Sequence, residues 1–258
     1  MTRPRLACCN FISDVEALKR FALEHGFEGI DWSFRRAELP DSAAGEEALA
    51  RTISRLAPLD VRYHCAFEKT DLGDIDAERA RDAMRIFRQV CRLVSKLGGE
   101  VMTIHVGLGH DSTLDLSWER TIESLGHLVR YAKSLHLRLC LENLAWGWTS
   151  RPDLFEKLIR KAGPWATLDI GHAHVSPSVT TQHYDLEDFV RPHPERFLNA
   201  HIYHEENDDG HVPPTALDEI VGRLHLLTEL PVCDWWVLEL REKEPLLETL
   251  AVVRRFWQ

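Results

Sequence analysis

The feature of this sequence that most constrains its fold is a repeated alternation of short apolar runs with longer amphipathic stretches. Eight runs rich in Leu, Cys, β-branched or aromatic residues have strand character, at residues 6–11, 29–33, 61–65, 101–106, 137–142, 166–170, 197–202 and 235–240. Between them, apolar residues recur at helical spacing, for example in 14–25, 76–97, 118–135, 151–161 and 217–227. Strict alternation of this kind indicates parallel strands joined by helices.

The number of these units matches one closed barrel. Eight strand–helix pairs in 258 residues agree with the typical length of a single α/β barrel, and no linker rich in Pro, Gly or Ser divides the chain. We therefore predict an α/β fold, a (β/α)8 TIM barrel, in one domain that spans residues 1–258. An open doubly wound sheet is the alternative, because periodicity alone does not show whether a sheet closes.

Composition argues against some classes of protein. The formal net charge of −10 disfavours nucleic acid as a partner, because neutralising phosphates requires clustered Lys and Arg. No apolar stretch approaches the roughly 20 residues of a membrane span, and the N-terminus has no long apolar run, so we expect a cytoplasmic protein without a membrane partner. The six cysteines include no CxxC pair and lie mostly in apolar runs, which predicts reduced core thiols. The sequence leaves the oligomeric state open.

Side chains that can bind metal stand at the ends of the last six predicted strands. Function in such a barrel resides in the loops that follow the strands. A single histidine or carboxylate there is most often structural, but carboxylates that end apolar strands are costly to bury unless they are paired or bound to metal. Their convergence on one barrel mouth predicts a metal site, with candidates His64, His105, Glu142, Asp169, His172, His174, His201, His204 and Glu239.

Several short motifs carry a resemblance to a known superfamily. They are IHVG at 104–107, LEN at 141–143, LDIGHAH at 168–174, AHIYH at 200–204, DGHVPP at 209–214 and LEL at 238–240. In this order, over nearly the entire chain, they resemble the xylose isomerase-like superfamily, which includes sugar-phosphate isomerases, ketose 3-epimerases and endonuclease IV. The resemblance implies a four-ligand metal site with His172 beside it, formed by Glu142, Asp169, His201 and Glu239.

The resemblance also implies a chemistry. Three carboxylates and an imidazole suit Zn, Mn, Co or Mg, so the identity of the divalent ion stays open. The implied enzyme is a metal-dependent isomerase or epimerase of a sugar or sugar phosphate that acts by proton transfer through an enediolate. Glu142 and Glu239 are the expected acid/base pair, and His172 is a further catalytic candidate.

Two other activities remain open on the same barrel. Endonuclease IV uses a cluster of three metals with additional ligands, for which this chain offers His64, His105, His172, Asp209 and His211. A phosphodiesterase acting on abasic-site DNA is therefore an alternative, provided that the acidic loop EENDDGH folds back over the barrel mouth rather than staying in solvent. A lyase or dehydratase is the third possibility.

One departure from the superfamily pattern concerns a cation. Ketose epimerases usually carry an arginine shortly after the seventh-strand histidine, whereas IYHEENDDGHVPP contains no Arg or Lys. Arg241, two residues beyond Glu239, is a candidate catalytic substitute, with a salt bridge to a neighbouring carboxylate as its alternative role. Trp32, Trp146 and Trp148 follow strand ends, where a flat ring can pack against a sugar or within the loops.

Overall fold

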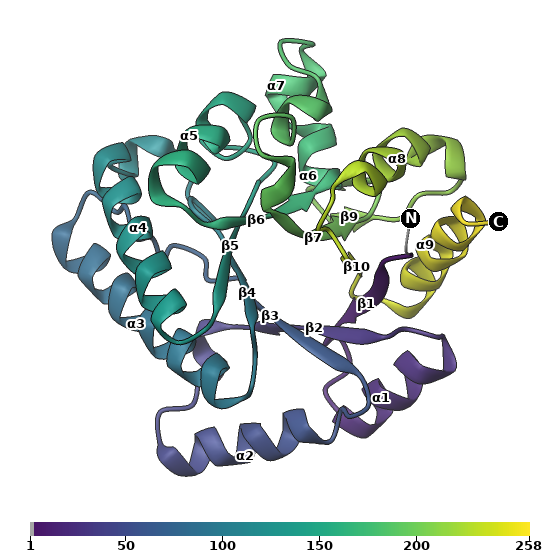
Figure 1. Ribbon diagram of the computed structural model, residues 1–258, viewed down its shortest axis with the longest axis horizontal. Coiled ribbons are helices and arrows are strands. Elements are labelled where there is room, and N and C mark those ends of the chain that lie inside the picture. The colour runs from purple at the N-terminus through teal and green to yellow at the C-terminus, as the bar shows by residue number, and fades with distance from the viewer. Residues whose placement is uncertain (1–2) are drawn as a thin grey trace.

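Eight parallel strands close into a barrel in the computed structural model, which describes residues 3–258 (Figure 1). Around the barrel the order is β1, β10, β7, β6, β5, β4, β3 and β2. Their bounds are β1 (Arg5–Cys9), β2 (Gly29–Phe34), β3 (Asp60–Cys65), β4 (Val101–Ile104), β5 (Arg138–Glu142), β6 (Trp165–Asp169), β7 (Phe197–Ile202) and β10 (Trp235–Leu238). The predicted (β/α)8 TIM barrel is confirmed, and the open sheet is excluded.

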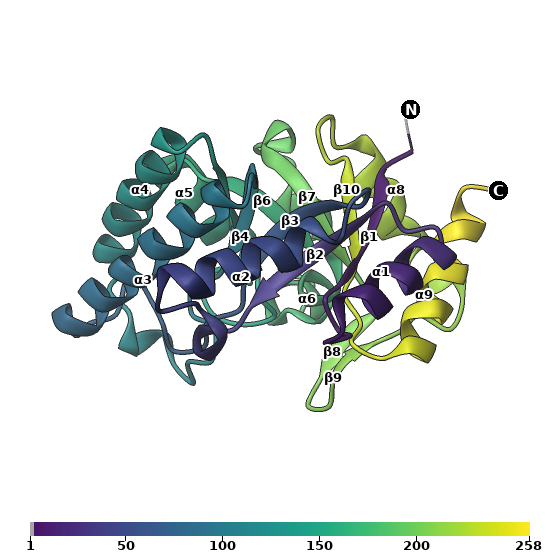
Figure 2. The ribbon, with the colours of Figure 1, turned by 90° about the horizontal axis from the view of Figure 1, so that it is seen from below.

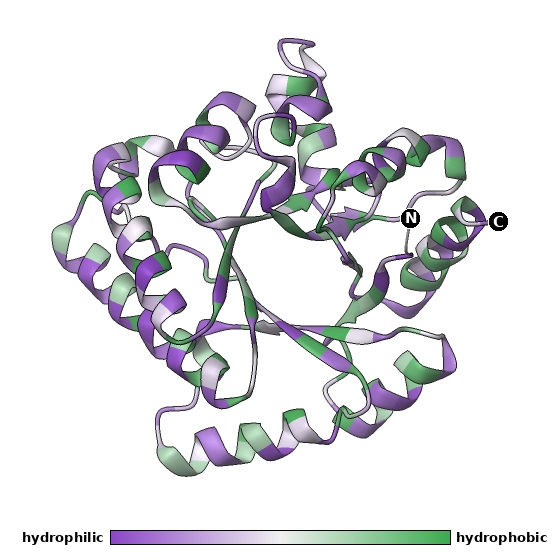
Figure 3. Ribbon diagram, viewed as in Figure 1, coloured by the Kyte–Doolittle hydropathy of each residue, from purple (hydrophilic) through white to green (hydrophobic). Residues whose placement is uncertain are grey.

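Helices surround the barrel, and all of them except the short α7 (Pro177–Thr180) have buried residues. They are α1 (Val15–Glu24), α2 (Ala43–Ser54), α3 (Ala77–Lys96), α4 (Trp118–Ser134), α5 (Pro152–Ala162), α6 (Ile170–Val175), α7 (Pro177–Thr180), α8 (Val221–Glu229) and α9 (Lys243–Phe256). Figure 3 shows hydrophobic and hydrophilic residues interleaved along these helices, as expected for elements with one apolar side. No helix within residues 3–258 is long and apolar enough to cross a membrane.

Local sequence explains where the helices begin and what they bury. The carboxylate of Asp14 accepts the N–H of Ala17 at the start of α1, which satisfies a donor that the helix itself leaves free. In α3, Phe87, Val90 and Val94 recur at three- and four-residue spacing and are buried in the main core. All six cysteines are free and buried, which agrees with the predicted reduced core thiols.

A polar network occupies the barrel interior toward the N-terminal ends of the strands. The side-chain N–H2 of Asn199 donates to the hydroxyls of Thr103 (3.1 Å) and Thr167 (3.2 Å). Arg62 donates to the side-chain oxygen of Asn199 and forms an ion pair with Asp234 at 2.7 Å. These groups satisfy one another, so this end of the barrel has a structural role.

A short hairpin follows β7 and belongs to the opposite end. It consists of β8 (Glu205–Asn207) and β9 (Gly210–Val212), which pair antiparallel. Figure 2 shows the hairpin on the side of the barrel away from the N-terminus. The acidic loop of the sequence therefore has a defined structure at the C-terminal end of the barrel.

Candidate metal centre

Four side chains converge where β5, β6, β7 and β10 end. Glu142 and Asp169 are the last residues of β5 and β6, His201 lies in β7, and Glu239 follows β10. The Nδ1 atom of His201 is 2.8 Å from Glu239 Oε2, 3.3 Å from Glu142 Oε1 and 3.9 Å from Asp169 Oδ2. One potential ligand atom from each residue lies within 4.8 Å of the others, and all four side chains are buried. We call these four residues the central group.

A second group shares Glu142 with the central group. The Nε2 atoms of His64 and His105 are 3.2 Å apart, and Glu142 Oε2 lies 3.5 Å from the first and 3.3 Å from the second. Ligand atoms bound tetrahedrally at 2.0–2.1 Å from Zn2+ are separated from one another by about 3.3 Å. The three atoms therefore have the spacing of one face of such a tetrahedron.

The hairpin supplies part of a third group. Glu206 Oε2 is 3.2 Å from Nε2 of His172, and Glu206 Oε1 is 3.8 Å from Nε2 of His211. His211 stacks on Tyr203 with ring centroids 3.8 Å apart, which fixes the hairpin over the mouth. Gly171, beside His172 in α6, has no room for a Cβ because the Tyr203 ring lies against it. The loop thus folds back over the metal-type ligands.

Asp209 does not join this group, although it was a predicted ligand. In the hairpin register, Glu206 pairs with His211, whereas Asp209 lies in the turn, is exposed and donates its N–H to Asn207 Oδ1. Residues directly opposite in an antiparallel pair have neighbouring side chains. The register therefore brings Glu206 rather than Asp209 beside His172 and His211, and Glu206 was missed because the loop sequence did not reveal a hairpin.

Backbone contacts set the orientation of three of the histidines. The Nδ1–H of His105 donates to the main-chain oxygen of Cys65 (3.3 Å), that of His172 to Asn143 (3.0 Å) and that of His211 to Glu239 (2.6 Å). A carbonyl oxygen only accepts, so the Nδ1 atom of each ring carries the proton. In the neutral ring the lone pair is then on Nε2, the atom that faces the ligand groups.

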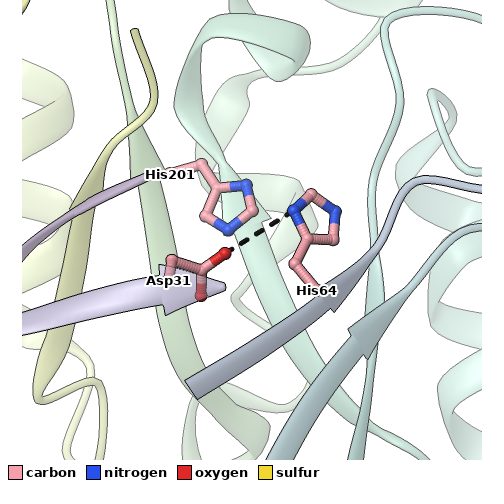
Figure 4. A group of neighbouring side chains, drawn as sticks. All are labelled: Asp31, His64 and His201. Carbon is pink, nitrogen blue, oxygen red and sulfur yellow. Dashed lines mark ion pairs between the residues drawn. The ribbon is translucent and has the colours of Figure 1, made fainter. Parts of the chain in front are cut away.

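Asp31 is a further buried carboxylate that the sequence analysis missed. It lies in β2, is 1 % exposed, and together with His64 and His201 forms a set of potential ligand atoms within 4.8 Å of one another (Figure 4). Its position inside the strand run GIDWSF, rather than at the end of that run, concealed it. The sequence contained one indication of Asp31: it is two residues from Ser33 in β2, so the two polar side chains lie on the same face of the strand.

The pKa values of the buried groups reflect a balance between burial and the charges of their neighbours. Burial alone lowers the pKa of His201, but Glu142 and Glu239 outweigh burial and hold that pKa well above its usual range. Burial alone would raise the pKa of Glu142, yet His201 and His105 keep it well below its usual range. For Asp31 and Asp169 burial dominates and raises the pKa to about 7 and about 6.

The donor set fits a divalent ion. The carboxylate oxygens of Glu142, Asp31 Oδ1 and Oδ2, Asp169 Oδ2, and both ring nitrogens of His201 are buried without a hydrogen-bond partner within residues 3–258. Such atoms are costly in a protein interior unless a cation or a bound ligand satisfies them. Mixed carboxylate and imidazole ligands suit Zn2+, Mn2+ and Co2+, and the carboxylate-rich central group also suits Mg2+.

Arg241 lines two cavities, one of which is lined by residues of the ligand groups. One, of about 330 Å3, is lined by Glu206, His211 and Glu239. The other, of about 440 Å3, is lined by Asn10, Trp32, Arg35 and Arg241. β10 ends at Leu238, so Arg241 lies beyond the strand and the alternation of strand faces does not determine where its side chain points. Within residues 3–258 the guanidinium of Arg241 makes no ion pair.

The remaining candidates lie outside the groups described above. Trp148 packs edge-on against Trp118 with ring centroids 5.0 Å apart, which gives it a place in loop packing. His174, His204 and Glu205 form another set of neighbouring donors. Arg223, however, donates to Nδ1 of His204 at 3.0 Å, so the neutral ring carries its proton on Nε2 and has no free lone pair for an ion.

The comparisons with solved structures place this fold among sugar epimerases and endonuclease IV. A D-tagatose 3-epimerase-like protein is 14% identical with a TM-score of 0.75, covering 98% of this chain and 97% of its own. Endonuclease IV from Thermus thermophilus is 18% identical with a TM-score of 0.70, covering 98% and 99%. D-psicose 3-epimerase from Clostridium cellulolyticum is 13% identical with a TM-score of 0.70, covering 98% of each. At these identities the likeness establishes the shared fold.

Comparison of sequences, in addition to structures, identifies the family of this chain. An uncharacterized protein of Methanocaldococcus jannaschii is 25% identical over 159 residues, which cover 62% of this chain and 67% of that protein. A family model described as the xylose isomerase-like TIM barrel matches residues 20–255, nearly the entire length of the barrel. This chain therefore belongs to the xylose isomerase-like TIM barrel family.

Proposed function

We propose that this chain is a metal-dependent isomerase or epimerase of a sugar or sugar phosphate. The observation that carries the proposal is the position of Glu142 and Glu239, whose carboxylates lie 3.3 Å and 2.8 Å from the same atom, His201 Nδ1. Two carboxylates at one metal-type ligand group provide both a proton acceptor and a proton donor beside a single substrate. Glu142, Asp169, His201 and Glu239 would hold the ion.

The chain's own residues account for the proton transfer. One carboxylate of the pair removes a proton from the carbon next to the substrate carbonyl, and the electron pair moves toward the carbonyl oxygen to give an enediolate. The other carboxylate returns a proton, to the neighbouring carbon or to the opposite face of the same carbon. A bound divalent ion supplies a Lewis acid that polarises the carbonyl or hydroxyl oxygen.

A phosphate on the substrate is supported by the cations beside the site. Arg35 and Arg241 line the 440 Å3 cavity, and within the described residues neither guanidinium forms an ion pair. Trp32 lines the same cavity and provides a flat ring for the apolar face of a sugar. Guanidinium groups bind phosphate oxygens through paired N–H donors, so a sugar phosphate with its phosphate in this cavity fits the surroundings.

Hydrogen exchange with solvent tests this function without knowledge of the product. Protein loaded with Mn2+ or Zn2+ is incubated in D2O with ketoses and ketose phosphates, and proton NMR follows the carbon next to the carbonyl. We expect deuterium incorporation that disappears in Glu239→Gln and persists in Glu123→Gln, whose side chain is 77% exposed. Protein with verified bound metal that exchanges no proton of any sugar in the panel would contradict the proposal.

One observation favours a second candidate, a phosphodiesterase acting on abasic-site DNA. The three ligand groups lie side by side, and the hairpin that carries Glu206 and His211 covers the mouth. Several clustered ions can activate water and stabilise the leaving oxygen together. The net charge of −10 argues against a DNA-reading surface, and two arginines suit one phosphate better than a duplex backbone.

Metal content together with nuclease activity separates the two candidates. The isomerase or epimerase requires only the central group, whereas the nuclease requires all three groups. Elemental analysis that returns about three metals per chain, with nicking of an abasic duplex that is lost in His211→Ala, would replace the first candidate by the second.

A further inference from the structure

Asp31 is a buried carboxylate at the barrel mouth that belongs to none of the three ligand groups described above. It extends from β2 between His64 of β3 and His201 of β7 (Figure 4). Its Oδ2 atom lies 3.6 Å from His64 Nδ1, and within residues 3–258 neither of its oxygens accepts a hydrogen bond. Burial of a carboxylate is costly without a partner, so packing alone does not account for Asp31 in this place.

His64 differs from the other histidines of the outer groups in what its Nδ1 atom faces. The Nδ1 atoms of His105, His172 and His211 each donate to a main-chain oxygen. The Nδ1 atom of His64 faces only side-chain oxygens within the described residues, namely Ser33 Oγ at 3.5 Å, Asp31 Oδ2 at 3.6 Å and Glu239 Oε1 at 3.7 Å.

Of these three oxygens, that of Asp31 is the carboxylate oxygen nearest to His64 Nδ1, and Asp31 lies outside the central group. Glu239 belongs to the central group, where its Oε2 atom lies 2.8 Å from His201 Nδ1, and its Oε1 atom is slightly farther from His64 Nδ1 than Asp31 Oδ2 is. A hydroxyl such as that of Ser33 is a weaker acceptor than a carboxylate. Meanwhile His64 Nε2 points at His105 and Glu142, at 3.2 Å and 3.5 Å. The ring therefore presents one nitrogen to Asp31 and the other to the ligand group.

We propose that Asp31 is a positioning residue that accepts the Nδ1–H of His64 and thereby directs the Nε2 lone pair into the His64–His105–Glu142 group. A carboxylate behind a metal-binding histidine fixes both the tautomer and the orientation of the ring. Asp31 does for His64 what main-chain oxygens do for the other three histidines. The inference rests on the proposed metal-dependent function, because it assigns Asp31 a role in building one of that site's ligand groups.

Titration with Zn2+ alone, followed by competition with a coloured chelator, tests the proposal. Asp31→Ala is expected to weaken binding at one group by roughly 10- to 100-fold, the range found when a residue behind a metal ligand is removed. Asp31→Asn is expected to keep the wild-type affinity, because its side-chain oxygen still accepts the Nδ1–H. Asp74→Asn, which removes a buried carboxylate paired with Arg79 outside the ligand groups, is the control.

Each outcome of the titration decides a separate point. Wild-type affinity in Asp31→Ala would overturn the positioning role, and Asp31→Asn binding as weakly as Asp31→Ala would assign Asp31 as a direct, charged ligand instead. A wild-type protein that binds no Zn2+ would overturn the proposed metal-dependent function itself.

A measurement on the unmodified chain covers the case in which Asp31→Ala does not fold. Long-range nitrogen–proton NMR of metal-free wild-type protein reports which ring nitrogen carries the proton. We expect the Nδ1–H form for His64, matching His105, whose Nδ1 faces the main-chain oxygen of Cys65. An Nε2–H form of His64 would overturn the proposal, because the lone pair would then face Asp31.

Discussion

The Nδ1–H of His211 donates to the main-chain oxygen of Glu239 across 2.6 Å. This hydrogen bond joins β9 of the hairpin to the residue that follows β10, and so links the third ligand group to the central group. Because the same ring stacks on Tyr203, the hairpin is anchored by both a polar and an aromatic contact.

Removal of the His211 ring is therefore expected to detach the hairpin and reduce metal binding. His211→Ala loses a ligand atom, the stacking partner of Tyr203 and the hydrogen bond to Glu239. We expect a lower metal-to-protein ratio by elemental analysis and faster proteolysis within 205–212. His127→Ala, at a side chain 52% exposed on α4, should leave both unchanged, and an unaltered ratio in His211→Ala would show that the third group binds no ion.

Neutralising either carboxylate of the acid/base pair should stop turnover without unfolding the barrel. Glu142→Gln and Glu239→Gln keep the side-chain volume but lose proton-transfer capacity, which contributes typically 10²–10⁴-fold to rate. We expect losses of about that size in kcat with an unchanged circular dichroism spectrum. Full activity in Glu239→Gln would rule out its assignment as acid or base.

Divalent metal should stabilise the folded chain. The buried oxygens without hydrogen-bond partners in the central group gain a cation only in the native state, so unfolding requires its release. At a metal concentration a hundredfold above Kd, the free energy of unfolding should rise by about 2.7 kcal/mol. Thermal melts with and without EDTA measure this effect, and identical curves for verified apo and loaded protein would mean that no such site exists.

The two arginines of the larger cavity should matter only for phosphorylated substrates. Arg35→Ala and Arg241→Ala each remove charge-assisted hydrogen bonds to a phosphate, so we expect kcat/KM for a sugar phosphate to fall by roughly tenfold or more. Values for the unphosphorylated sugar should stay the same. Arg51→Ala, at a side chain 72% exposed on α2, serves as the control. Equal losses on both substrates would instead place these residues in general substrate binding.

The polar network at the other end of the barrel predicts a pH effect on stability. Burial alone would raise the pKa of Asp234, but Arg62 and Arg5 outweigh it and lower that pKa below 3.8. A carboxylate with a lowered folded-state pKa stabilises the protein above pH 3.8, and this contribution is lost as the pH falls through the folded-state pKa.

The Asp234 side chain is more than half exposed, so solvent screens its ion pairs. Asp234→Asn should therefore destabilise the protein at pH 7 by roughly 0.5–1 kcal/mol and by clearly less near pH 2. Urea unfolding at both pH values gives the comparison. Asp82→Asn, in an exposed pair with Arg85, should change stability by less than about 0.5 kcal/mol at either pH. A deficit of the same size at both pH values would show that the Asp234 charge does not contribute.

Sequence periodicity was sufficient for the barrel and for the strand ends that carry metal-type side chains, and the family resemblance singled out the four residues of the central group. Glu142 and Asp169 end apolar strands, and the carboxyl ends of parallel strands in a closed barrel meet at one mouth. Their convergence could therefore be inferred from position along the chain. The predicted strand 235–240 is longer than β10, which ends at Leu238. Glu239 therefore lies just beyond the strand, and its carboxylate is still 2.8 Å from His201 Nδ1.

Tertiary structure decided which carboxylates lie beside His172, His211 and His64. The hairpin register places Glu206, and not Asp209, opposite His211. This pairing depends on where the turn forms, which the order of acidic residues in the loop does not reveal. Asp31 became visible only when β2 and β3 paired and placed it behind the His64 ring. The sequence determines which strand ends carry metal-type side chains. Contacts between separate elements depend on how those elements pack, and the spacing of residues within one segment does not reveal that packing.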